Sequence, residues 1–165
     1  MSEHPDVPVL RDPVMVAAFE GWNDAGEAAS NAVAHLEQVW DATPFVELDP
    51  EDYHDFQVNR PVVHLDDEGR RHVTWPTTRI SWARPPGADR DVLLVRGIEP
   101  SMRWRSFVVE VLGHGAAHGA TMLVTLGALL ADVPHTRPIP VSTTSDDPAL
   151  MERLALEPST YQGPT

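Results

Sequence analysis

The chain has 165 residues, enough for one domain with its own core, and its formal net charge of −13 argues against nucleic acid or an anionic membrane as a partner. It contains no cysteine, which excludes disulfides, thiolate catalysis and Cys-ligated zinc. Because the N-terminus is polar and acidic and no apolar run reaches transmembrane length, we expect a soluble cytoplasmic protein that does not enter a membrane.

A strand, a tight turn and a helix follow a proline-containing arm at residues 1–13. Residues 14–19 form an uncharged apolar run, as in a strand that is buried on both faces. Residues 24–40 carry apolar side chains at helical spacing, and Gly21 permits the turn between the two segments. This order is typical of the start of an α/β domain.

Acidic residues surround that turn. Asp24 and Glu27 fit a capping box at the start of the helix, with a carboxylate in place of the usual hydroxyl. Together with Glu20 they disfavour phosphate as a ligand of the helix N-terminus.

Most of the remaining chain alternates between strands and helices. Strands are predicted at residues 43–48, 79–84, 91–97 and 121–126, and helices at 102–118 and 147–154, the last capped by Ser145 or Asp146. Residues 49–52 are interpreted as a stop after the second strand. The sequence therefore predicts a three-layer α/β domain over residues 14–165 with a mostly parallel sheet.

A hairpin interrupts this alternation at about residues 60–76. Residues 60–65 and 70–75 flank an acidic turn that contains Gly69, and Pro61 and Pro76 bracket the whole segment. A polar hairpin inserted in an α/β core serves either self-association or as a solvated decoration, and the residues favour neither.

Three carboxylates follow predicted strands. Glu20, Glu99 and Asp132 each lie just past a strand's carboxyl end, where ligands bind in open α/β sheets. There they could bind a cation or act as general acid and base, or they could only cap helices and accept from loop N–H groups.

Polar and aromatic residues near these carboxylates are further candidates. Asn23 and Asp24 could orient a hydroxyl or amide of a ligand, although capping alone accounts for Asp24. Trp22 could stack on a ligand or pack within the turn. Arg103, at a predicted helix start, could bind a carboxylate or phosphate or pair with Glu99.

His135 and Arg137 lie in a loop held between Pro134 and Pro138. The prolines restrict the backbone, so the loop presents these side chains at low entropic cost. His135 could act as a general base with Arg137 binding an anion, or both could form a subunit contact or hydrogen bonds within the loop.

Four motifs occur in one order along the chain. They are Gly21-Trp22-Asn23-Asp24-Ala25-Gly26, then Gly97-Ile98-Glu99-Pro100 with Arg103-Trp104, then residues 126–138, and finally Tyr161-Gln162-Gly163-Pro164-Thr165. Together they resemble the proteasome assembly chaperone 2 family, in its actinobacterial branch, over essentially the whole chain.

The resemblance implies a fold and an assembly. It implies an α/β core similar to purine nucleoside phosphorylases and peptidyl-tRNA hydrolases, trimers formed through an inserted β-hairpin, and a C-terminal helical lid over a cleft. The hairpin at 60–75 matches this description. The lid would follow Thr165, so we expect it to be absent and the cleft to be more open.

Two alternative functions are consistent with the sequence and the resemblance. Bacterial members lack an established activity, whereas their eukaryotic namesakes chaperone proteasome assembly, so the resemblance implies a homo-oligomer that binds a protein partner or a small ligand. The ligand-binding candidates are Glu20, Trp22, Asn23, Asp24, Glu99, Arg103, Asp132, His135 and Arg137. The alternative is a phosphorylase- or hydrolase-type enzyme acting on a glycosyl or amide substrate, with Glu20, Glu99 and His135 as catalytic candidates. No cofactor and no metal site are predicted.

Overall fold

The structure is a computed structural model that describes residues 7–131 and 133–163. It divides the chain into two compact units, Met1–Leu130 and Ala131–Thr165. The first unit contains all the strands found among the described residues. The second contains a short helix, α4 (Pro148–Leu154), which Asp147 caps by accepting from the N–H groups of Ala149 and Leu150. The predicted caps Ser145 and Asp146 are therefore wrong.

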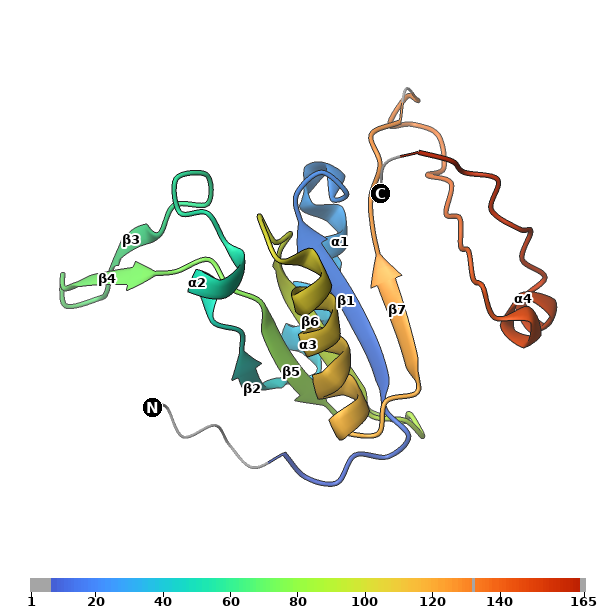
Figure 1. Cartoon of the computed structure of the whole chain (residues 1–165), viewed down its shortest axis with the longest axis horizontal. Helices are drawn as coiled ribbons and strands as arrows, with labels where there is room; N and C mark the ends of the chain where they lie inside the picture. Colours follow the sequence, from blue (N-terminus) through green and yellow to red (C-terminus); the bar gives the residue numbers. More distant parts are fainter. Residues whose placement is uncertain (1–6, 132, 164–165) are drawn as a thin grey trace. The chain divides into compact units, whose positions relative to one another are not determined.

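A five-stranded sheet forms the centre of the first unit (Figure 1). Its strands, in the order β2-β5-β6-β1-β7, are β2 (Thr43–Glu47), β5 (Arg79–Ala83), β6 (Val92–Ile98), β1 (Val14–Glu20) and β7 (Met122–Leu126). β1 pairs in parallel with β6 and β7, whereas β5 is antiparallel to both β6 and β2. The α/β class is confirmed, but the sheet is mixed, and the expectation of mostly parallel pairing is correct only for β6, β1 and β7.

The antiparallel pairs have a simple cause in the connections. A parallel neighbour needs a crossover of a dozen or more residues, usually a helix. Residues 84–91, which join β5 to β6, are too few for that and include Pro85, Pro86 and Gly87, so the chain turns back on itself.

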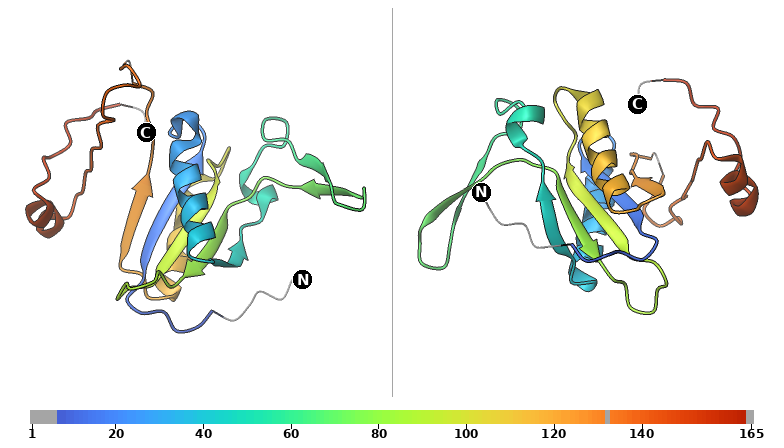
Figure 2. Two further views of the ribbon diagram at one scale, coloured as in Figure 1. Left: turned by 180° about the vertical axis from the view of Figure 1, so that it is seen from behind. Right: turned by 60° about the horizontal axis from the view of Figure 1, so that its bottom comes forward.

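Helices cover both faces of the sheet (Figure 2). They are α1 (Ala28–Val39) and α3 (Trp104–Ala117). The core on the α3 side includes Met15, Ala17, Leu93, Phe107 and Val111, and the core on the α1 side includes Ala18, Ala29, Val33 and Leu94. Because side chains alternate along β1 and β6, the two central strands supply both cores, and the result is a helix–sheet–helix arrangement.

A short helix that the sequence analysis missed, α2 (Pro50–Tyr53), follows β2. The Asp49 carboxylate accepts a hydrogen bond from the Glu51 N–H at 2.9 Å, and Pro50 lies in the first turn. Asp before Pro is a known signal for a helix start, so the interpretation of residues 49–52 as a simple stop was wrong.

The predicted hairpin forms a two-stranded sheet of its own. β3 (Val62–Leu65) is antiparallel to β4 (Arg71–Thr74), with Val63 opposite Val73. The Asp66 carboxylate closes the turn by accepting from the N–H groups of Glu68 and Arg70. Every residue of both strands is exposed, so the hairpin takes no part in the core.

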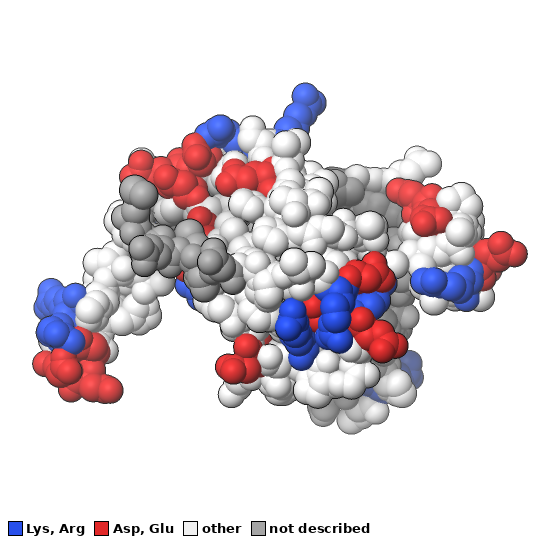
Figure 3. Space-filling view, turned by 90° about the horizontal axis from the view of Figure 1, so that it is seen from below, with Lys and Arg blue, Asp and Glu red and all other residues white. Residues whose placement is uncertain are grey.

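A buried carboxylate, Asp91, ties the N-terminal segment to the sheet. It accepts hydrogen bonds from the Arg11 backbone N–H at 2.8 Å and from the Arg11 Nε at 3.0 Å, and the Arg84 Nε lies 3.5 Å away. Burial alone would raise the pKa of Asp91, but the hydrogen bonds from Arg11 and the charges of Arg11 and Arg84 lower it. Figure 3 views this end of the unit, where basic and acidic side chains lie next to each other.

Replacing this carboxylate tests the anchor. We expect Asp91→Asn to lower the free energy of unfolding by about 2 kcal/mol, because hydrogen bonds to a charged group are lost. Asp12→Asn removes an exposed ion pair with Arg90 and should cost less than about 0.5 kcal/mol. Urea denaturation measures both.

The pH dependence gives a second test of the same anchor. Since the folded-state pKa of Asp91 is lowered, its contribution is complete above the ordinary carboxyl pKa of about 3.9 and is lost as the pH falls through the lower folded-state value. The difference between wild type and Asp91→Asn should therefore shrink in acid. A difference that is constant down to acid pH would contradict this account.

Candidate functional site

The carboxyl ends of β1 and β6 lie side by side because the strands pair in parallel, with Glu20 opposite Ile98. Glu20 is the last residue of β1, and Glu99 follows the last residue of β6. The Glu99 N–H donates to the Glu20 carbonyl oxygen at 2.9 Å. The structure thus places two of the three candidate carboxylates at one rim of the sheet, which we call the strand-end rim.

The Glu99 side chain turns back onto the turn after β1. Its Oε2 accepts a hydrogen bond from the Trp22 N–H at 3.3 Å. A Cβ added to Gly21 would lie 2.6 Å from that oxygen, and Gly21 has a φ of 146°, which side-chain-bearing residues rarely adopt. Of the two roles considered for Glu99, the geometry therefore fits a carboxylate that accepts from a loop N–H.

Asp24 caps helix α1 although it lies four residues before the first residue of the helix, Ala28. Its carboxylate is 5% exposed and accepts from the N–H groups of Ala29 at 2.7 Å and Ser30 at 3.2 Å. A 3-10 turn, η1 (Ala25–Glu27), lies between them, and Glu27 has a φ of 56° and makes no side-chain capping bond. The predicted capping box is wrong, although Asp24 does cap the helix.

The neighbouring residues of the turn differ in exposure and contacts. The Asn23 carbonyl oxygen accepts from the Ala128 N–H at 2.9 Å, and the Ala25 N–H donates to the Ala128 oxygen at 2.9 Å, which fixes the turn beside the segment after β7. Trp22 is 70% exposed. It does not pack within the turn, and its indole is available at the strand-end rim.

Arg103 is a brace between helices. It has a φ of 54° at the start of α3, and its guanidinium pairs with Asp52 of α2 and lies 5.7 Å from the centre of the Tyr53 ring. The Tyr53 hydroxyl donates to Glu110 of α3, and burial, followed by this carboxylate, raises the pKa of Tyr53 to about 12. Arg103 therefore pairs with α2 and not with Glu99.

The remaining candidates belong to the C-terminal part of the chain. Asp132 lies outside the described residues. His135 and Arg137 are exposed residues of the second unit, where the Arg137 N–H donates to the Pro134 carbonyl oxygen at 3.0 Å to close a turn. Their predicted roles stay predictions.

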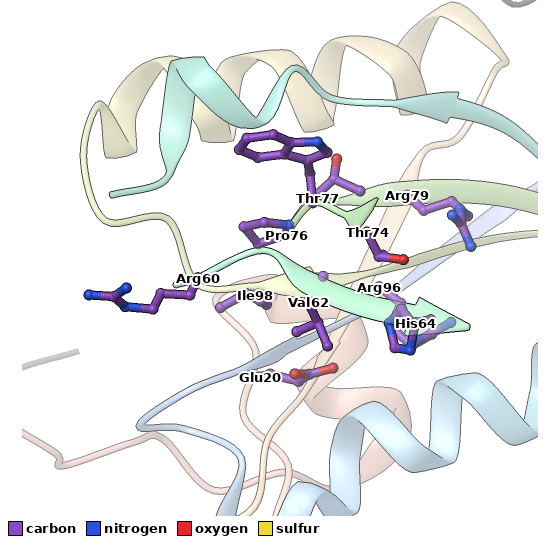
Figure 4. A pocket seen from close by; sticks show the side chains of 12 residues that line it. Glu20, Arg60, Val62, His64, Thr74, Pro76, Thr77, Arg79, Arg96 and Ile98 are labelled. Atoms are coloured by element: carbon purple, nitrogen blue, oxygen red, sulfur yellow. The ribbon is translucent and has the colours of Figure 1, made fainter. Parts of the chain in front are cut away.

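The Glu20 side chain lines a pocket whose opposite wall is the hairpin (Figure 4). The pocket has a volume of about 280 Å³. Its lining includes Glu20 of β1, Val62 and His64 of β3, Arg79 of β5, and Arg96 and Ile98 of β6. The hairpin wall was not predicted from the sequence. One signal for a polar site was present, because Arg96 is a charged residue within an otherwise apolar strand.

Arginines dominate the charge of this pocket. The Arg96 Nε donates to Glu37 at 2.8 Å, and the Arg79 Nε donates to Glu47 at 2.8 Å. Burial and then the charge of Glu27 raise the pKa of Glu20, with a smaller contribution from Asp24, whereas Arg96 opposes the shift. Glu20 thus binds a proton more readily than an ordinary glutamate.

The described part of the chain contains neither a metal-binding cluster nor a membrane-spanning helix. No group of three or more His, Cys, Asp or Glu side chains there is arranged to hold a metal ion. No helix there combines the length and apolar character that a membrane span requires.

Comparisons with known proteins agree on one family. The model of the PAC2 family matches residues 18–165. A PAC2 family protein from Streptomyces avermitilis is 62% identical with a TM-score of 0.87 over 93% of this chain, and a proteasome-assembly chaperone homologue from Mycobacterium tuberculosis is 54% identical with a TM-score of 0.82 over 92%. The chain spans 66% and 64% of those two proteins. Among curated proteins there was no match.

The capping role of Asp24 yields a prediction with a matched control. Asp24→Ala leaves the N–H groups of Ala29 and Ser30 without their acceptor, so we expect unfolding to become easier by about 1–2 kcal/mol. Glu27→Gln should change stability by less than about 0.5 kcal/mol, since Glu27 makes no capping bond. Thermal and urea unfolding measure both variants. Equal losses of stability would contradict this account, because they would indicate that Glu27 caps the helix together with Asp24.

Proposed function

This chain belongs to the PAC2 family, and from that premise we propose that it self-associates through its β3–β4 hairpin and binds a protein partner or small ligand at the strand-end rim. The trimer and the phosphorylase- or hydrolase-like sheet that the resemblance implies belong to the same proposal, as does the cytoplasmic location expected from the sequence. One relative is described as a proteasome-assembly chaperone homologue, which supports a protein as partner.

The exposure of the hairpin carries the proposal. One face of the hairpin, which we call the outer face, carries three exposed apolar side chains. They are Val63, which is 58% exposed, Leu65, which is 68% exposed, and Val73, which is 53% exposed. An isolated two-stranded hairpin is at best marginally stable in water, and adjacent exposed apolar side chains mark contact surfaces. A partner surface that covers the outer face would therefore stabilise the hairpin.

The charge pattern of the hairpin favours a second copy of the chain as that partner. Acidic residues of the hairpin lie at its turn, in Asp66, Asp67 and Glu68, and none lies within β3 or β4. Figure 3 shows acidic and basic side chains gathered together at the hairpin tip, on the left. In a chain with a net charge of −13, hairpin strands without carboxylates reduce the repulsion between copies that meet there.

Catalysis is not part of the proposal. Two of the groups that the enzyme alternative uses already have structural partners, since Glu99 accepts from the Trp22 N–H and Asp24 caps α1. The enzyme alternative would need these groups to be available for a substrate.

A pair of variants on one strand tests the association. Val63→Asp places a carboxylate on the outer face, and we expect it to raise the dissociation constant at least about a hundredfold, because burying an unpaired charge costs several kcal/mol. Val62→Asp is the control, because Val62 is equally exposed but lies on the opposite face, toward the pocket. Light scattering should give a monomer for the first and the wild-type mass for the second.

Three results would refute the proposal. They are a wild-type protein that is monomeric at all concentrations, a Val63→Asp variant with the wild-type mass, and equal dissociation of both variants. Circular dichroism confirms that each variant is folded.

A further inference from the structure

We propose that the pocket between the hairpin and the strand-end rim binds a small ligand with a single carboxylate on a compact apolar body. The inference rests on the ligand-binding part of the proposed function, and its test is read separately from self-association.

The size of the pocket limits the ligand. Pockets for drug-sized ligands have volumes of roughly 300–1,000 Å³. At about 280 Å³ this pocket falls just below that range, so it suits a molecule the size of one amino-acid side chain with its carboxylate.

The basic groups of the pocket favour an anion. Arg79, Arg96 and His64 lie at one end of it in Figure 4, while the Arg60 side chain extends away at the other end. Among the described residues that line the pocket, only Glu20 carries a carboxylate. In a chain with 25 acidic residues, this lining is an unusually basic surface.

Arg96 is the side chain best placed to hold the anion. Its Nε is fixed by Glu37 at 2.8 Å, while its terminal nitrogens donate to no described residue. Such a half-buried, oriented guanidinium presents two parallel N–H donors, the geometry that a carboxylate accepts. The Arg79 guanidinium, by contrast, donates to Glu47 through both its Nε and one of its terminal nitrogens.

The charge balance favours one negative charge over two. Glu37 and Glu47 already neutralise Arg96 and Arg79, and Glu20 lies in the same pocket. A phosphate, with a charge of about −1.5 to −2, would meet too little uncompensated positive charge. A monoanion can be accommodated when Glu20 takes up a proton, as two carboxyl groups do when they share one site.

The apolar walls complete the ligand description. Val62 of the hairpin and Ile98 of β6 lie between the basic end and Arg60, and Pro76 lies above them in Figure 4. They leave room for a branched aliphatic or small aromatic body next to the carboxylate.

The first experiment compares three probes of one shape: 4-methylpentanoate, 4-methylpentanamide and 4-methylpentylamine. In ¹H–¹⁵N NMR titrations we expect only the carboxylate to give saturable shifts of the Gly97 and Ile98 amides and the Trp75 indole. Equal shifts with the amide, tighter binding of the amine, or carboxylate shifts that avoid these three residues would overturn the proposal.

Two arginine variants separate a specific site from general attraction. Arg96→Lys keeps the charge and the partner Glu37 but loses the two-donor fork, and should weaken 4-methylpentanoate binding at least about tenfold. Arg71→Gln removes a charge from the hairpin outside the pocket and should change affinity less than about twofold. If Arg96→Lys kept the wild-type affinity, or if Arg71→Gln weakened binding as much as Arg96→Lys, the proposed site would be contradicted.

The pH dependence tests the role of Glu20. The charged and titratable groups around it are Arg96 on β6, Asp24 and Glu27 in the turn, and Arg60, His64 and Arg79 in the pocket lining. Affinity for ionised 4-methylpentanoate should rise as the pH falls from 8 into the range in which Glu20 takes up a proton, with uptake of up to one proton. Glu20→Gln should bind about tenfold more tightly at pH 8 and lose this dependence.

Affinity that rises with pH, or a Glu20→Gln variant that keeps the wild-type dependence, would overturn the proposal. Light scattering of the same samples reports self-association separately, so a missing carboxylate site in an associated protein refutes this inference alone.

Discussion

The parallel pairing of β1 with β6 is the contact on which the rest of the structure depends. It supplies the side chains of both cores, since alternate residues of the two strands pack under α3 and under α1. It also ends both strands at one rim, so that Glu20 and Glu99 meet there. Gly21 has no Cβ, and its place is taken by the Glu99 carboxylate. The position of the rim is thus a consequence of the packing of the core.

The hairpin adds to this rim what the core alone does not provide. Its inner face, with Val62 and His64, closes the pocket over Glu20, and its outer face, with Val63 and Leu65, is apolar and exposed. In our account these two faces act together, because a hairpin without a core needs an external contact to hold its inner face in position. Association and ligand binding would then be coupled through one element, and loss of the first would weaken the second.

The sequence predicted the parts of the fold that have strong local patterns. The apolar run at 91–97 is β6, and the periodic segment at 102–118 contains α3. The direction of β5 depends instead on the length of its connections. The partner of Arg103 is Asp52, a contact between residues 51 positions apart that no local pattern indicates. The pocket could not be predicted for the same reason, since it joins β1, the hairpin and β6.

Amide hydrogen exchange of residues 62–74 as a function of protein concentration is the most direct measure of the central claim, that contact between copies stabilises the hairpin. Our account predicts that these amides exchange near the unfolded rate in dilute protein and become protected as concentration rises, while amides of β1 and β6 keep the same protection throughout. Hairpin protection that does not depend on concentration would contradict it.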